Sequence, residues 1–475
     1  MHSFIMNKLT RSAAGCGLLV WAAAGWTQVL PFTVDAALQR AGIPVAAVGI
    51  YVQDVSAGAA LLEVNATAGF NPASVMKLVT TDAALELLGP TYAWKTRAYA
   101  AGLQYGDVLQ GDLIIQGSGD PKLVLENFWL FLRRIRAQGI RAINGNLVLD
   151  RSAFEDKPYD AAAFDGEPAK PYNVGPDALL LNYKTIGVRF LPDAAGATVQ
   201  VSVDLPLAGF RVAEPVLSRG DCGNWQDKLG AEFTDDGIIF NGAFPVACGD
   251  KTWYMNPYRI SPVQFFGKMF RQMWLELGGT FSGAVINGRL PNDASLITEW
   301  SSQALPEIIR DINKYSNNVM ARQVLLSLAP EIPMLPASTQ RGADAVRFWL
   351  AGKGINAPEL VIENGSGLSR YERISPRTLG RMLVAAFHAP TMPEFIASLP
   401  LAGLDGTMRK RLQNDTITGQ AHVKTGSLDQ VRSIAGYVLA ASGRRYVVVC
   451  LINDRNAALG RAAQDALLQW IYQDW

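Results

Sequence analysis

The sequence predicts an α/β (α+β) fold in which one domain of helices and strands is interrupted by a large β-rich insertion. Of the 475 residues, 49% are apolar and only 18% are charged, so the chain can bury large cores. Helical and strand patterns occur toward both ends of the chain, whereas the middle is rich in short strands separated by Gly, Pro and Asp turns. The length allows roughly two to four domains, so the insertion is expected to form domains of its own.

The first 28 residues have the pattern of a secretory signal peptide. Lys8 and Arg11 precede roughly a dozen apolar or small residues, and polar Thr27 and Gln28 follow. This apolar stretch is short for a membrane span, although an uncleaved anchor helix is the alternative. Cys16 lies inside it, but the apolar run before Cys16 is shorter than a lipoprotein site requires. The pattern therefore predicts export.

Residues 29–92 are expected to begin the first domain. Within them the sequence predicts a short helix over residues 33–42, a β-hairpin over residues 47–65 and a second helix over residues 70–90. Thr33 is the candidate cap of the first helix. Pro72 suits the first turn of the second helix, which ends before Gly89.

Residues 93–168 predict an inserted domain with strands and one helix, and residues 169–255 predict a second inserted domain that is β-rich. The first domain is expected to resume at residue 256 and to run to residue 475. Its expected elements are helices over residues 261–279 and 305–329, strands over residues 421–427 and 434–454, and a final helix over residues 458–475.

Three cysteines follow the signal segment. Cys450 lies in an apolar strand pattern and is expected to be a small buried side chain. Cys222 and Cys248 lie in a polar, loop-rich region of a chain that carries an export signal, so a disulfide between them is predicted. No further ligands accompany these two cysteines, so zinc is not expected.

Charge and motifs exclude several classes of function. The formal net charge is +1 without a run of like charges, so a nucleic-acid surface is not indicated. The sequence lacks an H-E-x-x-H helix and a G-x-x-x-x-G-K-[ST] loop, so neither a metal nor another cofactor is expected. A Ser-His-Asp triad would have to use His388 or His422, and no G-x-S-x-G elbow presents its serine.

Ser74 and Lys77 form an S-x-x-K pair at the start of the helix predicted over residues 70–90. Residues three apart lie on one face of a helix, so Lys77 can reach the hydroxyl of Ser74. A serine needs an adjacent base to become a nucleophile, and a lysine serves if burial or a nearby cation lowers its pKa. Taken alone, the pair indicates no more than a capping serine and a lysine that extends to solvent.

Two further short motifs follow in order. Ser316-Asn317-Asn318 follows a helical segment, and Lys424-Thr425-Gly426-Ser427 lies on a predicted strand. Each alone has an ordinary explanation, as a polar loop and as the end of a strand. Together with S-x-x-K, the order S-x-N and K-T-G matches the set typical of penicillin-binding proteins and class A β-lactamases.

The sequence therefore resembles the active-site-serine D-alanyl-D-alanine peptidases, and more narrowly the low-mass class C penicillin-binding proteins of the bacterial envelope. The narrow resemblance rests on FNPASVMK, YSNN, ENGSGLSRYERISP and HVKTGSL, and on the roughly 240 residues between Ser74 and Ser316. It implies a penicillin-binding/serine β-lactamase-like peptidase domain, with an antiparallel sheet flanked by helices, interrupted by two inserted domains. With the export signal, it implies a periplasmic protein that is soluble or loosely associated with the inner membrane.

The resemblance also implies roles for the motif residues. Ser74 would be the acylated nucleophile, Lys77 its general base, and Ser316 the relay of a proton to the leaving amine. Asn318 would hold Lys77 and the substrate amide. Lys424 would keep Lys77 deprotonated and attract the terminal carboxylate of the substrate. Thr425 would bind that carboxylate, and the backbone N–H groups of Ser74 and Ser427 would form the oxyanion hole.

Three other positions match family positions near the substrate side chain: Arg370, Asp150 and Phe154. Two positions depart from the family pattern. Glu363 stands where the related segment has aspartate, and Asp429 follows KTGSL where glutamine is expected. An acidic group beside the pocket could alter the preferred side chain.

The implied activity is that of a penicillin-sensitive D-Ala-D-Ala carboxypeptidase and endopeptidase acting on peptidoglycan stem peptides, with β-lactams as covalent inhibitors. The oligomeric state stays open. One alternative is a β-lactamase, but no E-x-x-x-N landmark is found and the large insertion is foreign to that class. The other is a catalytically silent envelope binding protein, against which the complete set of motif residues argues.

Overall fold

The computed structural model describes residues 30–475, apart from residues 194, 196, 331, 333 and 334. The predicted signal peptide therefore lies outside the described residues. Within the part of the chain that is described, no helix is both long and apolar enough to span a bilayer.

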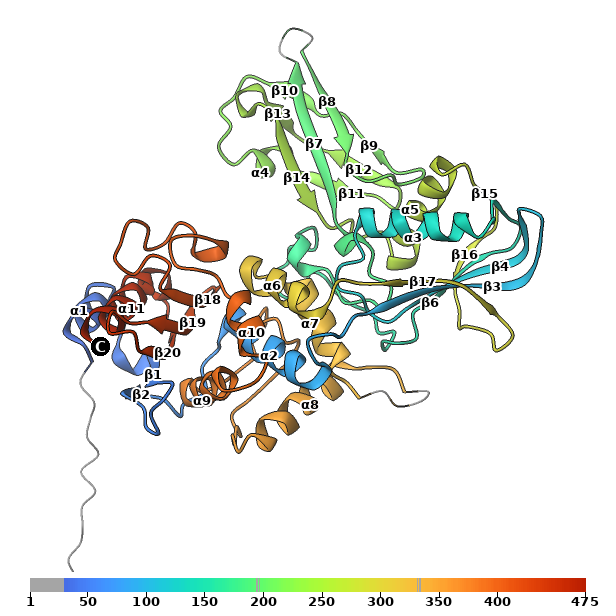
Figure 1. Ribbon diagram of the computed structural model, residues 1–475. Helices are drawn as coiled ribbons and strands as arrows, with labels where there is room; N and C mark the ends of the chain where they lie inside the picture. The colour runs from blue at the N-terminus through green and yellow to red at the C-terminus, as the bar shows by residue number, and fades with distance from the viewer. Residues whose placement is uncertain (1–29, 194, 196, 331, 333–334) are drawn as a thin grey trace, which may run out of the picture.

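Both ends of the described chain build one domain around a five-stranded antiparallel sheet (Figure 1). We call it the terminal domain. The strand β20 lies at its centre, and its residues alternate between two cores: Val448 and Cys450 face one, Val447 and Val449 the other. The strand order is β18 (Ala421–Leu428), β19 (Val431–Leu439), β20 (Arg445–Asn453), β1 (Val48–Asp54) and β2 (Leu62–Val64).

Helices cover both faces of this sheet, which confirms the predicted α+β class. The helix α1 (Phe32–Arg40) packs with α11 (Arg461–Asp474) over one face. Thr33 lies inside α1, whose N-cap is Pro31, so the predicted cap is wrong. The helices of the other face are α2 (Met76–Leu88), α6 (Leu305–Tyr315), α7 (Asn318–Ser327), α8 (Thr339–Gly352), α9 (Pro376–Phe387) and α10 (Met392–Ser398).

The helix α2 is the central helix of the terminal domain. Every residue from Met76 to Leu85 is buried, so α2 lacks the exposed polar face of a surface helix. A 3-10 turn, η2 (Ala73–Val75), precedes it directly after Pro72, and Gly89 ends it with a φ of 85°. The start of α2 thus lies deep in the molecule, where a polar side chain is shielded from water.

A seven-stranded mixed sheet forms the inner insertion. Its path is β15-β5-β4-β3-β17, and β6 joins β4 and β16 beside that path. The helices α3 (Leu125–Ala137) and α5 (Pro262–Glu276) pack on it in one apolar core. The strands are β3 (Lys95–Tyr105), β4 (Val108–Gly117), β5 (Ala142–Ile143), β6 (Leu147–Asp150), β15 (Thr280–Phe281), β16 (Val285–Asn287) and β17 (Ser295–Ser301).

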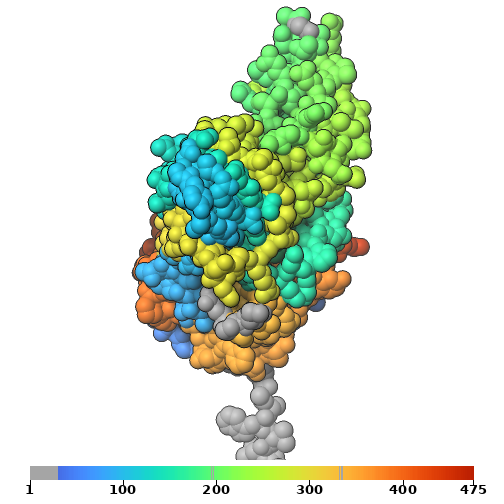
Figure 2. Space-filling model, turned by 90° about the vertical axis from the view of Figure 1, so that its right-hand side faces the viewer, coloured from blue at the N-terminus to red at the C-terminus, as the bar shows by residue number. Residues whose placement is uncertain are grey.

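Residues 186–255 form an outer insertion of short strands, which projects from one end of the molecule (Figure 2). It shares a continuous apolar core with the inner insertion, since Phe190 and Phe233 belong to the same cluster as Phe128. Its elements are β7 (Ile186–Asp193), β8 (Thr198–Val203), β9 (Arg211–Val212), β10 (Val216–Ser218), α4 (Trp225–Leu229), β11 (Ala231–Phe233), β12 (Gly237–Phe240), β13 (Ala243–Pro245) and β14 (Lys251–Met255).

Strand pairing differs from the predicted return to the first domain at residue 256. Strand β17 pairs with β3, β15 with β5 and β16 with β6, so residues 280–301 complete the inner sheet. Residues 262–276 cover the same sheet as α5. We therefore propose that the terminal domain resumes near residue 302, because strands separated by the whole outer insertion close one sheet.

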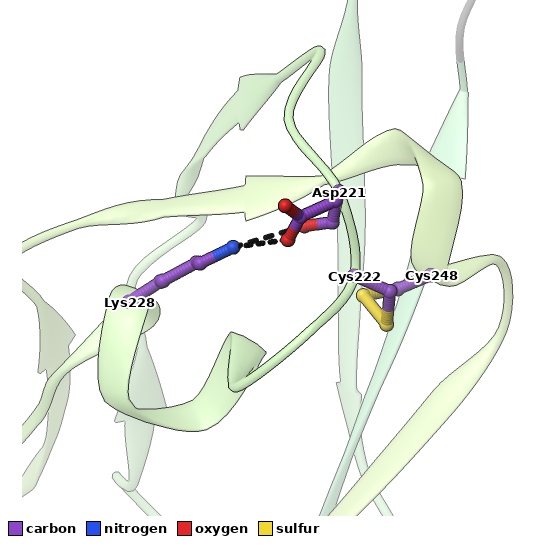
Figure 3. Close-up of a disulfide and its surroundings, with 4 residues drawn as sticks. All are labelled: Asp221, Cys222, Lys228 and Cys248. Atoms are coloured by element: carbon purple, nitrogen blue, oxygen red, sulfur yellow. Dashed lines mark hydrogen bonds and ion pairs between the residues drawn. A yellow bond between two sulfur atoms is a disulfide. The ribbon is translucent and has the colours of Figure 1, made fainter.

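The predicted disulfide between Cys222 and Cys248 is present in the outer insertion, with the two Cα atoms 4.7 Å apart (Figure 3). Lys228 donates to both the backbone carbonyl and the carboxylate of neighbouring Asp221. Cys450 is a free, buried cysteine, as expected. The disulfide thus ties a loop to the start of β14 in a unit with few long elements.

Replacing Cys222 and Cys248 together by serine is expected to lower the free energy of unfolding of the outer insertion by about 3 kcal/mol, because a cross-link restricts the unfolded chain. Tryptophan fluorescence in a denaturant titration measures the change, since Trp225 packs on Trp253 beside the disulfide. Reduction of the unchanged protein is the matched control and should reproduce the shift. Identical unfolding curves for the variant and the unchanged protein would contradict the prediction.

Candidate active site

The turn that carries Ser74 is held in a strained conformation by a network of side chains. Ala73 has a φ of 45°, in the left-handed region that favours glycine. Asn71 holds this turn, because its Oδ1 accepts from the backbone N–H of Ala73 at 2.9 Å and its Nδ2 donates to Ser369 O at 2.9 Å. Asn453 on β20 donates to the carbonyl of Asn71 at 3.0 Å. Such strain persists only where the surroundings enforce it, which is typical of functional turns.

Lys77 lies one turn further along and is fully buried, so the alternative of a lysine extending to solvent is excluded. Its Nζ lies 3.0 Å from Ser74 Oγ and 2.6 Å from Asn318 Oδ1, and it also donates to the carbonyl of Ser366. A neutral amine has two hydrogens and one lone pair. With the two hydrogens on Asn318 and Ser366, the lone pair faces the hydroxyl of Ser74.

The surroundings of Lys77 favour this neutral form. Burial lowers its pKa well below the usual lysine value, and the positive charges of Lys424 and Arg322 lower the pKa further. Glu372 acts in the opposite direction. Among the described residues Lys77 makes no ion pair with a carboxylate, so a buried ammonium there would lack a direct counter-charge.

Lys424 forms a second buried amine beside the first. Its Nζ donates to Ser316 Oγ at 2.9 Å and to the carbonyl of Thr425 at 2.7 Å. Burial lowers its pKa to about 7. Ser316 itself ends α6 with a left-handed φ of 58°, and this conformation aims its hydroxyl at Lys424. At neutral pH a bound anion would therefore shift Lys424 toward its charged form.

The strand β18 packs directly against the Ser74 turn. A Cβ atom added to Gly426 would lie 2.1 Å from Ser433 Oγ and 2.9 Å from Ser74 N, so only glycine fits. Ser433 on β19 donates to Pro72 O at 2.6 Å. β18 is the outermost strand of its sheet, and an outermost strand can pair with an extended peptide.

The remaining residues of K-T-G-S line the same edge. Thr425 Oγ1 donates to Thr407 Oγ1 at 2.9 Å, and Arg432 donates to Ser427 Oγ. Asp429, which departs from the family pattern, is exposed just beyond the end of β18. The structure thus brings together, from three separate segments of the chain, Ser74, Lys77, Ser316, Asn318, Lys424, Thr425 and Ser427.

Sequence reasoning missed Glu372, which organises the loop that contacts Lys77. Its Oε1 accepts from the backbone N–H groups of Glu363, Asn364 and Gly365 at 3.1, 2.9 and 2.9 Å. Its Oε2 is buried and has no hydrogen-bond partner in the part of the chain that the structure describes, and burial raises the pKa of Glu372. No local pattern marks Glu372, because its partners lie seven to nine residues earlier in an irregular loop.

Replacing Glu372 by glutamine is expected to shift the acylation pH profile to lower pH. The change removes a carboxylate that raises the pKa of Lys77, so Lys77 stays neutral in more acidic solution. The amide oxygen can still accept from the loop N–H groups. The rate of penicillin acylation measured against pH tests this, and a shift toward higher pH would refute it.

Arg370, Asp150 and Phe154 lie apart from this cluster of side chains. Arg370 stacks on Phe164 at 4.7 Å and lines a cavity of about 340 Å³ that Glu363 and Asn364 also line. Asp150 is buried, and its oxygens accept from Gln116, Ser152 and the N–H of Leu290. Phe154 packs over Gly119. The contacts of Asp150 and Phe154 support structural roles. Arg370, in contrast, faces a cavity beside the loop that Glu372 organises.

The histidines of the described chain do not form a triad. His388 Nε2 lies 2.7 Å from the carbonyl of Val55, and His422 Nδ1 lies 3.2 Å from the carbonyl of Ile396. Over residues 30–475, with the gaps stated above, no group of three or more His, Cys, Asp or Glu side chains is arranged to hold a metal ion. The described chemistry is therefore that of a serine, two buried lysines and an asparagine.

Comparisons with known proteins identify a family that spans nearly the whole described chain. A sequence model of the D-Ala-D-Ala carboxypeptidase 3 (S13) family matches residues 30–473. The chain is 28% identical over 455 residues to a D-alanyl-D-alanine carboxypeptidase of Actinomadura sp. (strain R39), which covers 91% of this chain and 82% of the relative. It is 25% identical over 421 residues to D-alanyl-D-alanine carboxypeptidase DacB of Haemophilus influenzae, covering 86% and 85% of the two chains.

The fold has solved counterparts. The crystal structure of penicillin binding protein 4 (dacB) from Haemophilus influenzae matches with a TM-score of 0.78 at 23% identity, over 93% of this chain and 99% of the other. The same protein in complex with a β-lactam matches with a TM-score of 0.75, also at 23% identity, over 93% and 100% of the two chains. The likeness confirms the penicillin-binding fold with inserted domains.

Proposed function

The chain belongs to the D-Ala-D-Ala carboxypeptidase 3 (S13) family, and from this membership we propose how it cleaves peptidoglycan stem peptides. The protein is a serine-type D-alanyl-D-alanine carboxypeptidase of the low-mass class C penicillin-binding type. One observation carries the assignment of its nucleophile: a fully buried lysine amine lies 3.0 Å from the Ser74 hydroxyl and, within the described chain, makes no ion pair with a carboxylate.

Acylation begins when neutral Lys77 accepts the hydroxyl proton of Ser74. Ser74 Oγ then bonds to the carbonyl carbon of the penultimate D-alanine, and the backbone N–H groups of Ser74 and Ser427 stabilise the oxyanion. The contact between Gly426 and Ser74 N supports this pairing, because it holds the strand of Ser427 against the nucleophile.

Collapse of the tetrahedral intermediate breaks the peptide bond and releases the leaving amine. The amine needs one proton, which Ser316 passes to it while Lys77 loses the proton it took from Ser74. Water then hydrolyses the ester and regenerates Ser74. A terminal D-alanine as leaving group gives carboxypeptidase action, whereas the amine of a cross-linked peptide gives endopeptidase action.

Lys424 and Thr425 bind the terminal carboxylate of the substrate in this proposal. The support is electrostatic: burial lowers the pKa of Lys424 to about 7, so an arriving carboxylate both gains a cation and stabilises it. Asn318 positions Lys77 through its 2.6 Å hydrogen bond and has an N–H group left for the substrate amide. The cavity beside Arg370 is suited to the side chain of the substrate residue that precedes the two terminal D-alanines.

β-Lactams acylate Ser74 by the same route, since their strained amide occupies the place of the scissile bond. The leaving nitrogen stays tethered to the acyl group, which obstructs the approach of water. We propose that this acyl-enzyme forms in the periplasm, to which the signal-like pattern of residues 1–28 directs the chain. The protein acts there without a cofactor.

Labelling of the purified protein with a fluorescent penicillin tests the proposal, together with D-alanine release from a soluble pentapeptide. We expect a stable label on the tryptic peptide that contains Ser74, and release of D-alanine that penicillin blocks. Rapid hydrolysis of nitrocefin without stable label would establish the β-lactamase alternative. Neither label nor D-alanine release would establish the silent binding protein.

A further inference from the structure

A large polar cavity lies where the inner insertion, the outer insertion and their connecting segment (residues 151–185) meet. Its volume is about 780 Å³. It is formed by the residues after β6 and before β7, by the turn between β14 and α5, and by β16 (Figure 1). Four basic and two acidic side chains line it: Arg151, Lys157, Lys184, Arg259, Asp156 and Asp177. Arg151 pairs with Asp177, Lys157 with Glu155 and Arg259 with Asp235, which leaves Lys184 as the basic side chain of the lining without an ion pair among the described residues.

Lys184 is the most unusual of these side chains, because it is only 8% exposed and has no carboxylate partner among the described residues. Its Nζ donates to Asn256 Oδ1 and to Pro257 O, both at 3.1 Å. An ammonium has three hydrogens, so one is left for a group in the cavity. Burial lowers the pKa of Lys184 to about 8, and Asp177 offsets this only in part. Arg151 binds both carboxylate oxygens of Asp177, at 3.0 and 2.9 Å.

The backbone around Lys184 is strained. Asn182, Tyr183 and Lys184 have φ values of 47°, 54° and 45°, three consecutive left-handed residues without a glycine. The strain is enforced from outside, since Asn182 N donates to Leu123 O at 2.9 Å and Asn182 Oδ1 accepts from Leu125 N at 3.2 Å. Backbone strain that the surroundings enforce is typical of functional sites.

The cavity continues toward the candidate active site. Tyr159, Ala161 and Pro176 line both this cavity and the smaller one beside Arg370. The smaller cavity is also lined by Asn364, two residues before Ser366, whose carbonyl accepts from Lys77. The two cavities therefore share a wall, which runs from the loop that contacts Lys77 to Lys184.

We propose that the cavity at Lys184 binds a free carboxylate of polymeric peptidoglycan, remote from the bond that is cleaved. The carboxylate accepts the remaining hydrogen of Lys184 and gains a second cation from Arg259, which is exposed at the rim. This inference rests on the proposed function, because it assigns the polymer as substrate. It gives the insertions the task of holding the polymer while the terminal domain cleaves it.

The test compares D-alanine release from polymeric peptidoglycan with release from a short soluble pentapeptide. For Lys184→Met we expect kcat/KM on the polymer to fall about 10-fold, the effect of losing one charge-assisted hydrogen bond, and kcat/KM on the pentapeptide to stay unchanged. Arg259→Gln should give a smaller fall, about threefold, again on the polymer alone. Lys251→Gln removes an exposed charge on β14 away from the cavity, and this matched control should change neither rate.

Penicillin labelling reports whether each variant folds. If Lys184→Met takes up no penicillin, Arg259→Gln decides, because the exposed Arg259 can be replaced without opening the core. Equal falls on both substrates, or no fall on the polymer, would overturn the inference. Inhibition of the pentapeptide reaction by acetate would also overturn it if Lys184→Met and Arg259→Gln removed that inhibition. The cavity would then bind a free small carboxylate.

Co-sedimentation of each protein with insoluble peptidoglycan separates this inference from the proposed function. The assay needs no catalysis, so it stays informative if the unchanged protein releases no D-alanine. We expect Lys184→Met and Arg259→Gln to leave more protein in the supernatant than the unchanged protein and Lys251→Gln. Equal sedimentation of all four would contradict the site whatever the activity.

Discussion

Replacing Ser74 by alanine is expected to abolish covalent labelling by penicillin and to lower D-alanine release by about 10⁴-fold or more. The variant lacks the oxygen that forms the ester, whereas the buried network around it can remain. Lys77 keeps its hydrogen bonds to Asn318 and Ser366, so the fold should survive. Gel fluorescence of the penicillin label and chromatographic assay of D-alanine measure the two losses.

The Ser74→Ala experiment needs a control in which another serine is replaced by alanine. Ser433→Ala is not suitable, because Ser433 Oγ supports the Ser74 turn. Ser442→Ala is better, since Ser442 lies at the exposed turn between β19 and β20. This control should retain full labelling and release. Persistent penicillin labelling of the Ser74→Ala protein would refute Ser74 as the nucleophile.

Replacing Lys77 by arginine is expected to lower the acylation rate by about 10²–10⁴-fold, because a guanidinium stays protonated and cannot accept the proton of Ser74. The pH profile gives the sharper measurement. In the unchanged protein acylation rises with pH as Lys77 loses its proton, and burial and Lys424 move that rise well below the usual pKa of lysine. In the variant this rise should disappear.

Stopped-flow measurement of penicillin acylation from mildly acidic to alkaline pH tests this prediction. Lys410→Arg is the matched control, because Lys410 is exposed and the same substitution there should leave the profile unchanged. An identical pH profile for Lys77→Arg and the unchanged protein would show that another group takes the proton of Ser74.

Much of the secondary structure was predictable, because local patterns of apolar residues indicate individual strands and helices. The continuous apolar run within Arg445–Asn453 predicted a buried strand, and β20 is the central strand with a core on each face. The helices over residues 261–279 and 458–475 were found at α5 and α11, and Ser261 caps α5 as its position before Pro262 suggests. The hairpin of residues 47–65 was also confirmed.

The domain boundary was harder to predict for a physical reason. The strands β15, β16 and β17 are short and partly exposed, and their partners lie more than a hundred residues earlier. Their sequences carry no local signal of those partners. The predicted return at residue 256 rested on helical periodicity, which does not distinguish a helix of one domain from that of another.

The candidate site divides in the same way. The sequence by itself determined the chemical groups and their order: a serine and a lysine three residues apart, then S-x-N, then K-T-G on a strand. Only the tertiary structure decided that Lys77 is buried, that Glu372 holds the loop touching it, and that a buried Lys184 without an ion pair among the described residues faces a distant cavity. Burial and charge depend on which segments pack together, and the contacts of the site join residues up to 382 positions apart.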